Sequence, residues 1–464
     1  MRGEAGQFPL DARTVRVVGR ALARHLAERT GGRAPRIVTG RDTRESGVWI
    51  EEALLAGARA IGAEVESAGV ITTPGVAYLA RTLPADAGVV ISASHNPYRD
   101  NGIKIFAPSG RKMDDATERR IEADIVAAQS DEISRREEDE SGRSEDEALP
   151  VDDRERFIES HAARHALELQ TRYLDYLTTE VAGELSLAGL SIAMDCANGA
   201  AARLAPALFK RLGARVIAIN DAPDGRNINL NCGSLHIEGL QKTVIEAAAD
   251  MGVAYDGDAD RALFVDARGR FVDGDATLWV MAKHLDASGE LKDKLVVSTV
   301  MSNIGLELAL RERGMSLRRT DVGDKYVLEE LLRAEASIGG EQSGHIIFPR
   351  QSLAGDGMMT TLLLLRAMID EGKALHELTA GFEHYPQVLV NVRVREKRPF
   401  AEVVEIAEAA RAVEEQLGGE GRLLLRYSGT EPLARVMIEG ARQDEIERLA
   451  NELAGTIKSA LGDA

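Results

Sequence analysis

Short apolar segments alternate with longer amphipathic ones along most of the chain. Residues 36–39 predict a strand that ends in the turn Gly40-Arg41-Asp42, and the apolar spacing of residues 48–60 predicts a helix after it. Strands that alternate with helices in this way are typical of a mostly parallel sheet covered by helices. The same rhythm recurs in the predicted strands 87–92, 190–195, 215–219 and 294–299, the predicted helix 201–212 and the apolar segment 359–370.

The C-terminal part of the chain has a different pattern. It predicts strands at 387–394, 422–426 and 435–439 and helices at 400–417 and 443–461. We therefore expect an α/β fold of three α/β units with mixed, mostly parallel sheets, followed by an α+β unit. Boundaries near Pro150, Gly269 and Gly372 divide the chain into units 1–150, 151–269, 270–372 and 373–464.

Composition and charge narrow the classes of function. The 464 residues are 44% hydrophobic and 28% charged, as in an ordinary globular protein. The formal charge of −18 repels nucleic acid and anionic lipid, so we expect no nucleic-acid or membrane partner, and a phosphate site would need a local basic pocket. Cys196 and Cys232 give no disulfide framework, and no apolar run has the length of a membrane span. These features predict a cytoplasmic enzyme.

One segment is strongly acidic. Residues 131–147 hold nine acidic and three basic side chains and almost nothing apolar. The segment could bind a basic partner, but a solvated connection between two units is the better interpretation.

A first candidate site follows the predicted strand 87–92. The segment Ser92-Ala93-Ser94-His95-Asn96-Pro97 leads into a loop that continues to Lys104. Such a loop holds a hydroxyl at the carboxyl end of a sheet, where α/β folds bind their ligands. His95 and Lys104 offer a base and a cation beside Ser94. A turn whose Ser and Asn side chains cap the backbone is the alternative.

A second candidate is Asp256-Gly257-Asp258-Ala259-Asp260-Arg261, which lies between two apolar segments. Three carboxylates at alternate positions of a loop converge on one hard cation, such as Mg²⁺. An EF-hand would need Gly and Glu where this chain has Arg261 and Ala267. A solvated acidic turn is disfavoured, because carboxylates crowded between buried strands repel one another unless a cation offsets their charge. Arg261 could hold a phosphate against the metal.

Two further polar loops follow. Residues 339–345 place Glu341, Ser343 and His345 among glycines, a set suited to the hydroxyls of a sugar, although for this motif alone a tight polar loop is the favoured interpretation. Near the C-terminus, two arginines bracket a turn rich in hydroxyls, which is a good cradle for a phosphate dianion. A solvated turn is the alternative there. This second loop consists of Arg426, Tyr427, Ser428, Gly429, Thr430, Glu431 and Pro432, followed by Arg435.

Together and in this order, the four segments resemble the signatures of the α-D-phosphohexomutase family: its phosphoserine, metal, sugar and phosphate loops. They stand here as residues 92–97, 256–261, 340–345 and 426–432, one in each predicted unit. The resemblance covers nearly the whole chain. It implies four domains around a central cleft.

The resemblance also implies a role for each candidate residue. Ser94 would be carried as a phosphoserine, and one Mg²⁺ would be held by its phosphoryl group with Asp256, Asp258 and Asp260. The groups that would move protons or stabilise charge around Ser94 are Lys104, His95, Arg2 and Arg261. The sugar would be bound by Glu341, Ser343 and His345. Its phosphate would be bound by Arg426, Ser428, Gly429, Thr430 and Arg435.

Within the family, the chain looks most like the bacterial branch that interconverts glucosamine 6-phosphate and glucosamine 1-phosphate. That reaction passes through glucosamine 1,6-bisphosphate and feeds the synthesis of UDP-N-acetylglucosamine and of the cell wall. The likeness lies in Gln342, where relatives specific for glucose or mannose usually have another residue, and in segments 223–234 and 322–327. A phosphomannomutase or phosphoglucomutase is one alternative, and a non-catalytic sugar-phosphate-binding relative is another. The resemblance also implies a homodimer, and Ser94 first phosphorylated by a kinase or by the enzyme itself.

Two features depart from the family pattern. Tyr427 stands where the family usually has proline, which bears on the rigidity of the phosphate loop. The family also has a Phe-Gly-Thr-Asp-Gly segment before the Arg-Gly pair that stands here as Arg2-Gly3. We therefore expect the natural start to lie upstream of Met1; otherwise Arg2 would sit on a fraying terminus.

Overall fold

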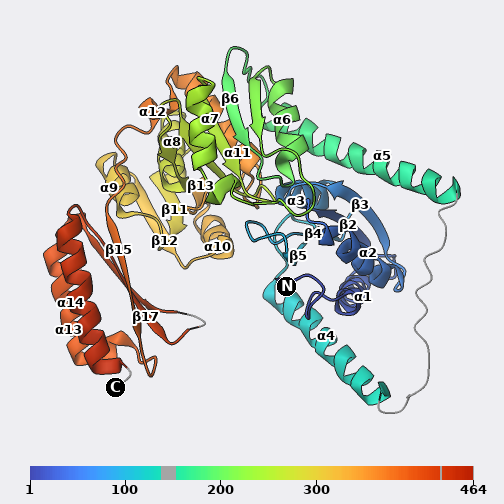
Figure 1. Cartoon of the computed structure of the whole chain (residues 1–464), viewed down its shortest axis with the longest axis horizontal. Coiled ribbons are helices and arrows are strands. Elements are labelled where there is room, and N and C mark those ends of the chain that lie inside the picture. The colour runs from blue at the N-terminus through green and yellow to red at the C-terminus, as the bar shows by residue number, and fades with distance from the viewer. Residues whose placement is uncertain (137–152, 429–430, 463–464) are drawn as a thin grey trace.

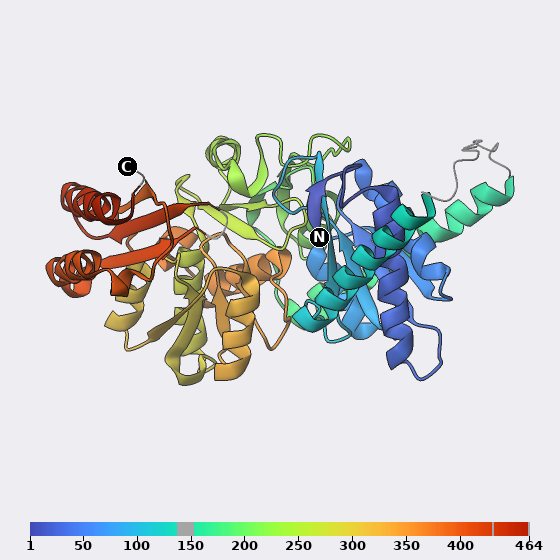
Figure 2. The same ribbon diagram turned by 90° about the horizontal axis from the view of Figure 1, so that it is seen from below.

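The computed structural model of the protein describes residues 1–136, 153–428 and 431–462. Within these residues, four sheets follow one another along the chain and form an arc, with the N-terminal and C-terminal units at its two ends (Figure 1). The view from below shows the same two units at opposite ends of the molecule (Figure 2). In the described part of the chain, no helix combines the length and the apolarity needed to cross a membrane.

The first unit is built on a mixed sheet. Its strands, in spatial order, are β1 (Arg2–Glu4), β5 (Asp100–Phe106), β4 (Ala87–Ile91), β2 (Arg36–Arg41) and β3 (Glu64–Val70). Strands β4, β2 and β3 are parallel, and β1 and β5 are antiparallel to their neighbours. Strand β4 is apolar and buried throughout, as expected for a central strand covered on both faces. The helices are α1 (Ala12–Arg29), α2 (Ser46–Arg59), α3 (Thr73–Thr82) and α4 (Asp115–Arg136).

The second unit repeats this plan. Its strands, in spatial order, are β10 (Phe271–Val272), β9 (Ala262–Asp266), β8 (Met251–Tyr255), β6 (Ser191–Asp195) and β7 (Arg215–Ile219). Strand β10 pairs with β9 from just beyond the limit at 269 drawn from the sequence. The helical segments are α5 (Asp153–Tyr176), a π-helical turn (Leu177–Val181), α6 (Ala201–Arg211), a 3₁₀ turn (Gly233–Leu235) and α7 (Glu238–Glu246). Helix α5 reaches back to the first unit, where Gln170 Nε2 donates to Ala68 O of β3 (2.8 Å).

The third unit has a smaller sheet with the order β12 (Ser316–Thr320), β11 (Leu295–Thr299), β13 (Ile338–Gly340) and β14 (Ile346–Ile347). Strands β12, β11 and β13 are parallel, and β14 returns antiparallel to β13. The short connection between β13 and β14 carries the predicted sugar loop. The helical segments are α8 (Gly274–Ala287), a 3₁₀ turn (Lys292–Lys294), α9 (Ile304–Glu312), α10 (Asp324–Ala334), α11 (Gly357–Glu371) and α12 (Leu375–Leu378).

The fourth unit is an antiparallel sheet covered by two helices. Its strands, in spatial order, are β15 (Gln387–Arg393), β17 (Leu433–Glu439) and β16 (Arg422–Tyr427). Helices α13 (Val404–Leu417) and α14 (Gln443–Leu461) cover it, with 3₁₀ turns at Phe400–Glu402 and Gly418–Glu420. Apolar residues of β15, β16, β17 and the two helices form a core of their own. The largest apolar cluster, in contrast, joins residues of the first three units, from Val38 to Leu378.

The structure confirms the predicted α/β fold with an α+β unit at its C-terminal end. The predicted strands and helices are present with shifts of a few residues, and the apolar segment 359–370 is helix α11. Of the acidic segment 131–147, residues 131–136 end helix α4, and the remainder lies outside the described residues. The boundary near Pro150 lies outside them as well, so the four domain limits stay a prediction.

Candidate active site

The metal loop connects the antiparallel strands β8 and β9. It presents carboxylate oxygens of Asp256, Asp258 and Asp260 within 4.8 Å of one another, and all three residues are buried. Ala259 adopts a left-handed conformation (φ 55°), which turns the chain tightly enough to point alternate side chains to one spot. The loop is therefore a cluster of three buried acidic groups, of which the Asp260 side chain is 11% exposed.

Two oxygens of this cluster accept no hydrogen bond from any residue that the structure describes. They are Asp258 Oδ1 and Asp260 Oδ1, and both are buried. A buried carboxylate oxygen without a donor is costly unless a cation faces it. Hard divalent cations such as Mg²⁺ prefer carboxylate oxygens as ligands. The donor set of the loop therefore fits a single divalent cation.

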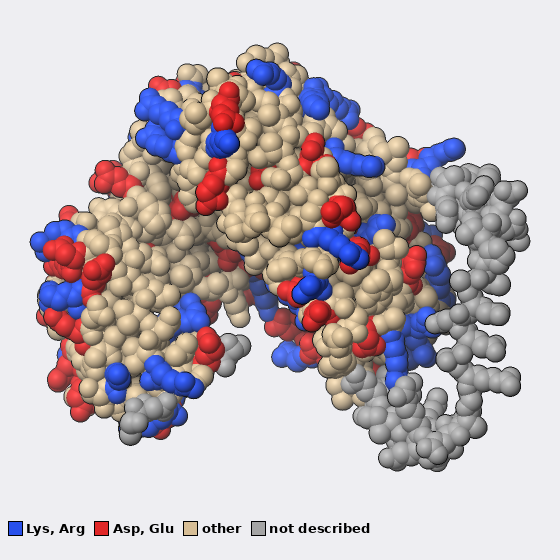
Figure 3. Space-filling model, viewed as in Figure 1, with Lys and Arg blue, Asp and Glu red and all other residues tan. Residues whose placement is uncertain are grey.

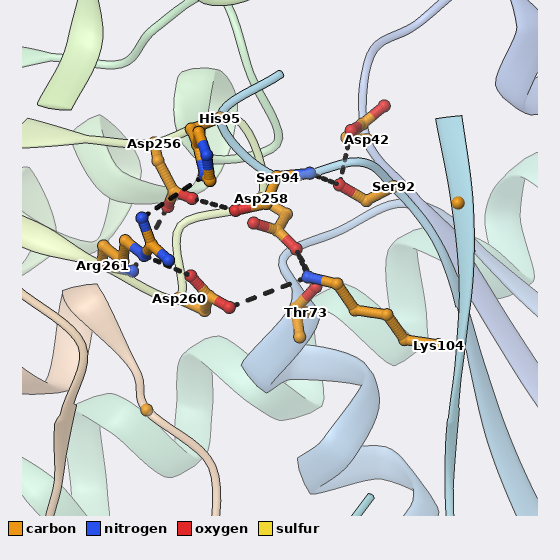
Figure 4. Close-up of polar contacts among 12 residues, drawn as sticks. Asp42, Thr73, Ser92, Ser94, His95, Lys104, Asp256, Asp258, Asp260 and Arg261 are labelled. Carbon is orange, nitrogen blue, oxygen red and sulfur yellow. Dashed lines mark hydrogen bonds and ion pairs between the residues drawn. The ribbon is translucent and has the colours of Figure 1, made fainter. Parts of the chain in front are cut away.

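Ser94 lies against the metal loop (Figure 4). Its hydroxyl donates to Asp256 Oδ2 at 2.5 Å, and the residue is only 3% exposed. Its φ of 54° is in the left-handed region, which costs free energy for a residue with a Cβ. Burial, together with the neighbouring carboxylates of Asp260 and Asp258, raises the pKa of Asp256 well above its usual range. The Ser94 hydroxyl is thus held at a defined distance from the acidic cluster.

Arg44 holds the strained Ser94 loop in place. Its guanidinium is fully buried and donates to the carbonyl oxygens of Ser94 (2.9 Å) and Asn96 (2.9 Å). It also donates to the carbonyls of Pro97 and Asp100 and forms an ion pair with Asp42 at 2.9 Å. One side chain thereby fixes four carbonyl groups of the loop.

Two more side chains complete this support. Asp42 Oδ2 accepts from the Ser92 hydroxyl (2.6 Å), and Ser92 Oγ in turn accepts from the backbone N–H of Ser94 (2.9 Å). From the second unit, Asn229 Nδ2 donates to the carbonyls of Ser94 (2.9 Å) and Asn96 (3.0 Å). The loop is therefore clamped from both units that meet at the site.

Lys104 lies on the other side of the metal loop. Its ammonium is 2.5 Å from Asp258 Oδ2 and 3.7 Å from Asp260 Oδ2. Thr73, the first residue of α3, donates its hydroxyl to the same oxygen of Asp258 (2.5 Å). Burial alone would lower the pKa of Lys104, but the carboxylates of Asp258 and Asp260 raise it above its ordinary value. Lys104 is therefore a fixed positive charge at neutral pH.

His95 faces two arginines. Arg261 Nη1 lies 3.3 Å from His95 Nδ1, so Nδ1 accepts and the ring proton is on Nε2. Burial, followed by the charges of Arg261 and Arg2, lowers the pKa of His95. Arg2 comes from β1, opposite Gly102 of β5. His95 is thus a neutral imidazole whose lone pair, on Nδ1, is used by Arg261.

The sugar loop packs directly on the metal loop. The backbone N–H of Ala262, the residue after Arg261, donates to Gly344 O (3.1 Å). Gly344 has a φ of 88°, and a Cβ there would lie 2.4 Å from Ala262 O, so only glycine permits this approach. His345 Nδ1 lies 3.7 Å from Asp260 Oδ2, and its Nε2 accepts from the backbone N–H of Gly355 (3.2 Å). Ser343 Oγ donates to Glu341 Oε2 (3.3 Å).

The phosphate loop stands apart from these three loops. Arg426 of β16 and Arg435 of β17 lie opposite each other in the fourth unit, and Ser428 is buried beside them. Gly429 and Thr430 lie outside the described residues. In the part of the chain that the structure describes, no hydrogen bond or ion pair joins Arg426, Ser428 or Arg435 to the other loops. Figure 3 shows a hollow between the N-terminal and C-terminal units on this face.

A cavity of about 490 Å³ adjoins the metal and sugar loops between the first and third units. Thr73, Asp260, His345 and Asp324 of α10 are among the residues that line it. Asp324 forms an ion pair with Lys112 (2.5 Å), which bridges the third and first units. The cavity and the hollow together leave the site open for a ligand of small-molecule size.

Analysis of the sequence missed Asp42, Arg44 and Thr73 as members of the site. Asp42 and Arg44 directly follow the parallel strand β2, and Thr73 begins the helix after the parallel strand β3. Because the carboxyl ends of parallel strands meet at one edge of a sheet, all three lie near the loop that follows β4. The predicted parallel strands therefore indicated that Asp42, Arg44 and Thr73 lie near Ser94. They gave no such indication for Asn229.

Family models match the chain in four consecutive stretches. They are described as phosphoglucomutase/phosphomannomutase alpha/beta/alpha domain I (residues 1–132), domain II (171–269), domain III (273–385) and C-terminal domain (389–456). Each stretch contains one of the four sheets, apart from the two-residue strand β10 and the first two residues of β15.

Named relatives match over the full length. The phosphoglucosamine mutase of Solibacter usitatus is 48% identical over 463 residues, which are 100% of this chain and 98% of that protein. The phosphoglucosamine mutase of Rhodococcus jostii is 47% identical over 442 residues, covering 95% and 94% of the two chains. That of Myxococcus xanthus is 44% identical over 461 residues, covering 99% and 96%.

Solved structures show the same fold. A phosphoglucomutase/phosphomannomutase family protein from Burkholderia thailandensis has a TM-score of 0.75 at 23% identity, covering 99% of this chain and 96% of that one. N-acetylphosphoglucosamine mutase from Aspergillus fumigatus, in complex with GlcNAc-6P and magnesium, has a TM-score of 0.59 at 22% identity, covering 84% and 92%. The four matched domains and the full-length relatives confirm the resemblance found in the sequence: the chain belongs to the phosphoglucomutase/phosphomannomutase family.

Proposed function

We propose that this protein interconverts glucosamine 6-phosphate and glucosamine 1-phosphate. Several relatives that match over the full length, at 44–48% identity, carry the name phosphoglucosamine mutase. The structural observation that carries the proposal is the Ser94 hydroxyl, buried and 2.5 Å from the acidic cluster of the metal loop. A hydroxyl in that position can carry a phosphoryl group next to a divalent cation.

In this proposal, Asp256, Asp258 and Asp260 would hold one Mg²⁺, and Asp258 Oδ1 and Asp260 Oδ1, which accept no hydrogen bond within the described residues, would be among its ligands. The bound ion would neutralise the charge of the phosphoryl oxygens, which is the main requirement of phosphoryl transfer. Lys104 adds a second fixed positive charge beside the cluster. Arg44 and Asn229 keep the Ser94 loop from moving while its phosphoryl group reacts.

In the first half of the reaction, phosphorylated Ser94 gives its phosphoryl group to the free hydroxyl of the sugar phosphate. The bond between Ser94 Oγ and phosphorus breaks, a bond between phosphorus and the sugar oxygen forms, and the proton of the sugar hydroxyl passes by way of a base to Ser94 Oγ, which becomes a hydroxyl again. His95 Nδ1 can be that base once Arg261 turns from it to the phosphoryl oxygens, whereas Lys104 remains protonated and stabilises negative charge. The product is the 1,6-bisphosphate.

In the second half, the bisphosphate turns within the site and returns its other phosphoryl group to Ser94. In each orientation of the bisphosphate, the phosphate group that does not react must bind to the fourth unit. Arg426, Ser428 and Arg435, with Gly429 and Thr430, would bind it there. Glu341 and Ser343 would hold the sugar hydroxyls in between. The hollow between the units gives the intermediate room to turn (Figure 3).

The test is mutase activity with Mg²⁺ and a trace of 1,6-bisphosphate, which phosphorylates Ser94 without a kinase. We expect faster turnover of glucosamine 6-phosphate than of glucose or mannose 6-phosphate. A faster rate with glucose or mannose phosphate would instead identify a phosphoglucomutase or phosphomannomutase.

Ser94→Ala is the matched control, and it should abolish turnover. Label from a bisphosphate should appear on Ser94 in the wild-type chain and be absent from this variant. Binding of sugar phosphates by the wild type without label transfer would identify a non-catalytic binder and refute the proposal.

A further inference from the structure

Gln342 lies between the two proposed sugar-binding residues, but its side chain has different partners. Glu341 and Ser343 are hydrogen-bonded to each other. Gln342 Nε2 instead donates to Asp273 Oδ2 (3.2 Å) and lies 3.1 Å from His384 Nε2. An amide carries two N–H groups, and these two contacts occupy both. The nitrogen of Gln342 is therefore engaged within the protein.

Asp273 anchors the sugar loop to helix α8. It caps the N-terminus of α8 by accepting from the backbone N–H of Ala276 (2.9 Å) with its other oxygen. The backbone also takes part, because Gly274 N donates to Gln342 O (3.0 Å). A Cβ on Gly274 would lie 2.0 Å from Glu341 O, so the loop rests directly on the first turn of the helix. The sugar loop is thus fixed to α8 by both side chain and backbone.

His384 belongs to the connection between the third and fourth units, residues 379–386. The next residue, Tyr385, is held by Asn303: Tyr385 N donates to Asn303 Oδ1 (2.9 Å), and Asn303 Nδ2 donates to Tyr385 O (3.0 Å). Asn303 Nδ2 also lies 3.4 Å from Glu439 Oε1. His384 is therefore adjacent to the point where the connection is clamped to the third unit.

Glu439 links this point to the fourth unit. It is fully buried at the end of β17, accepts from the backbone N–H of Ile304 (3.2 Å) and pairs with Arg422 at 2.7 Å. Strand β17 also carries Arg435 of the phosphate loop. A continuous set of contacts thus runs from the sugar loop through His384 and Tyr385 to β17, the strand that follows the phosphate loop.

We propose that Gln342 is a positioning residue: its amide ties the sugar loop to the connection between the third and fourth units and so sets the sugar-binding groups relative to the phosphate loop. The inference deepens the proposed function and rests on it, because only a reaction that grips sugar and phosphate together needs this spacing. The opposing possibility is that Gln342 binds the sugar itself and distinguishes glucosamine from glucose. In that case His384 has no part in catalysis.

The test uses Gln342→Leu, His384→Ala and the double variant, with Gln443→Leu on the exposed face of α14 as the matched control. Gln342→Leu removes two hydrogen bonds, one of them to the Asp273 carboxylate, and should raise the KM for glucosamine 6-phosphate about tenfold, whereas His384→Ala removes only the contact shared with Gln342 and should raise it about fivefold. The double variant should be no worse than Gln342→Leu, because that substitution already removes the contact with His384. The ratio of glucosamine to glucose turnover should stay within about twofold of the wild type, as for substitutions that leave sugar contacts intact.

Two further measurements exclude a merely structural effect. His384→Gln keeps an acceptor in place of Nε2 and should restore the KM. More free 1,6-bisphosphate should escape per turnover in Gln342→Leu and His384→Ala, because sugar and phosphate are no longer held at a fixed spacing. An unchanged KM in His384→Ala, or a changed sugar preference in Gln342→Leu alone, would overturn the inference.

Hydrogen exchange of the ligand-free protein tests the tie without relying on turnover. Residues 379–386 should exchange faster in Gln342→Leu than in the wild type or in Gln443→Leu. Unchanged exchange there refutes the tie. A wild-type chain that turns over no sugar phosphate refutes the proposed function instead, so the two failures are distinguishable.

Discussion

The Ser94 loop and the phosphate loop would each bind a phosphoryl group, yet they are built differently. Ser94 is 3% exposed, and buried Arg44 fixes four carbonyls of its loop. Arg435 has a side chain that is 29% exposed, its Nε has no partner among the described residues, and its ion pair with Glu431 is a loose 3.4 Å. Hydrogen bonds therefore hold the Ser94 loop in place before any ligand binds, whereas the phosphate loop keeps a hydrogen-bond donor that no described residue pairs with.

The difference follows from what each loop would have to do. A reacting phosphoryl group must be held in line with its acceptor, so groups aligned in advance and shielded from water favour transfer. The phosphate group that does not react needs only to be bound, and its site must accept a phosphate group on position 1 or on position 6 of the sugar. The phosphate loop accordingly belongs to a unit with an apolar core of its own, which polar contacts of Glu439 and Arg422 join to the third unit.

The largest effect should come from Arg44→Met, which removes the side chain that fixes the Ser94 loop. The substitution leaves buried Asp42 without its partner, and loss of one member of a buried ion pair costs about 3–5 kcal/mol of the free energy of unfolding. The four released carbonyls free the Ser94 loop, so kcat should fall about a hundredfold or more, as expected for misplaced reacting groups. Denaturant unfolding and mutase assays measure the two effects.

Arg442→Met provides the matched control. Arg442 forms an exposed ion pair with Glu445 at 2.7 Å, and such pairs contribute about 0–1 kcal/mol. Wild-type kcat and near-wild-type stability are expected. A kcat for Arg44→Met within twofold of the wild type would show that the Ser94 loop does not need its support.

The asymmetry between the two loops also explains what the sequence could predict. The four polar segments were recognisable because each follows a strand with an apolar pattern and places polar side chains at fixed spacing. The structure brings Ser94, His95 and Lys104 together with the metal and sugar loops, and Arg2 lies near enough for its charge to lower the pKa of His95. Their roles stay a prediction until they are measured.

The supporting groups were harder to predict because they depend on packing between distant parts of the chain. Arg44 meets Ser94 across 50 positions and Asn229 meets it across 135. Nothing local distinguishes Arg44 from an exposed arginine, since its burial results from the way β2 and β4 pair. Likewise, Gln342 is recognisable in a polar loop, but its contact with His384 depends on where the third unit ends.

A second prediction concerns Asp275 of α8, near the connection between the third and fourth units. Asp275 accepts from the backbone N–H of Asn303 (2.7 Å), the residue that holds this connection. Its other oxygen is buried and accepts no hydrogen bond within the described ranges of the chain. Burial, together with the charge of Asp273, raises the pKa of Asp275 to about 7. An unfolded aspartate titrates near 4, so the folded state binds the extra proton between these values. The contribution of Asp275 to stability is therefore complete below pH 4 and is lost as the pH rises to 7.

Asp275→Asn removes this titration. The variant should gain stability relative to the wild type as the pH rises from 4 to 7, by up to about 4 kcal/mol for three pKa units, and the gain should level off above that. Urea unfolding at several pH values measures the difference. Asp370→Asn, at an exposed position, is the control. A difference between wild type and Asp275→Asn that does not change with pH would contradict the prediction.

A third prediction concerns the negative charge that phosphorylated Ser94 adds to the metal loop. Phosphorylation of Ser94 adds nearly two negative charges beside three buried carboxylates. Mg²⁺ should therefore bind about a hundredfold more tightly to the phosphorylated than to the unphosphorylated chain, since nearby charges act strongly at buried sites. Calorimetry on the two forms measures this ratio, with Asp258→Asn as a variant that should bind weakly in both. Equal affinities would mean that the phosphoryl group does not face the ion.

The smallest effect should come from Arg435→Gln on the open side. Loss of one charge-assisted hydrogen bond at a half-exposed position should raise the KM about tenfold. Arg395→Gln, in the same unit but bonded to Ala460 O, is the control. Because the phosphate loop must accept either end of the sugar, the KM values for glucosamine 6-phosphate and glucosamine 1-phosphate should rise by the same factor. A rise of the KM for only one of the two substrates would show that phosphate groups at positions 1 and 6 bind in different places. That result would contradict a single phosphate-binding site for both.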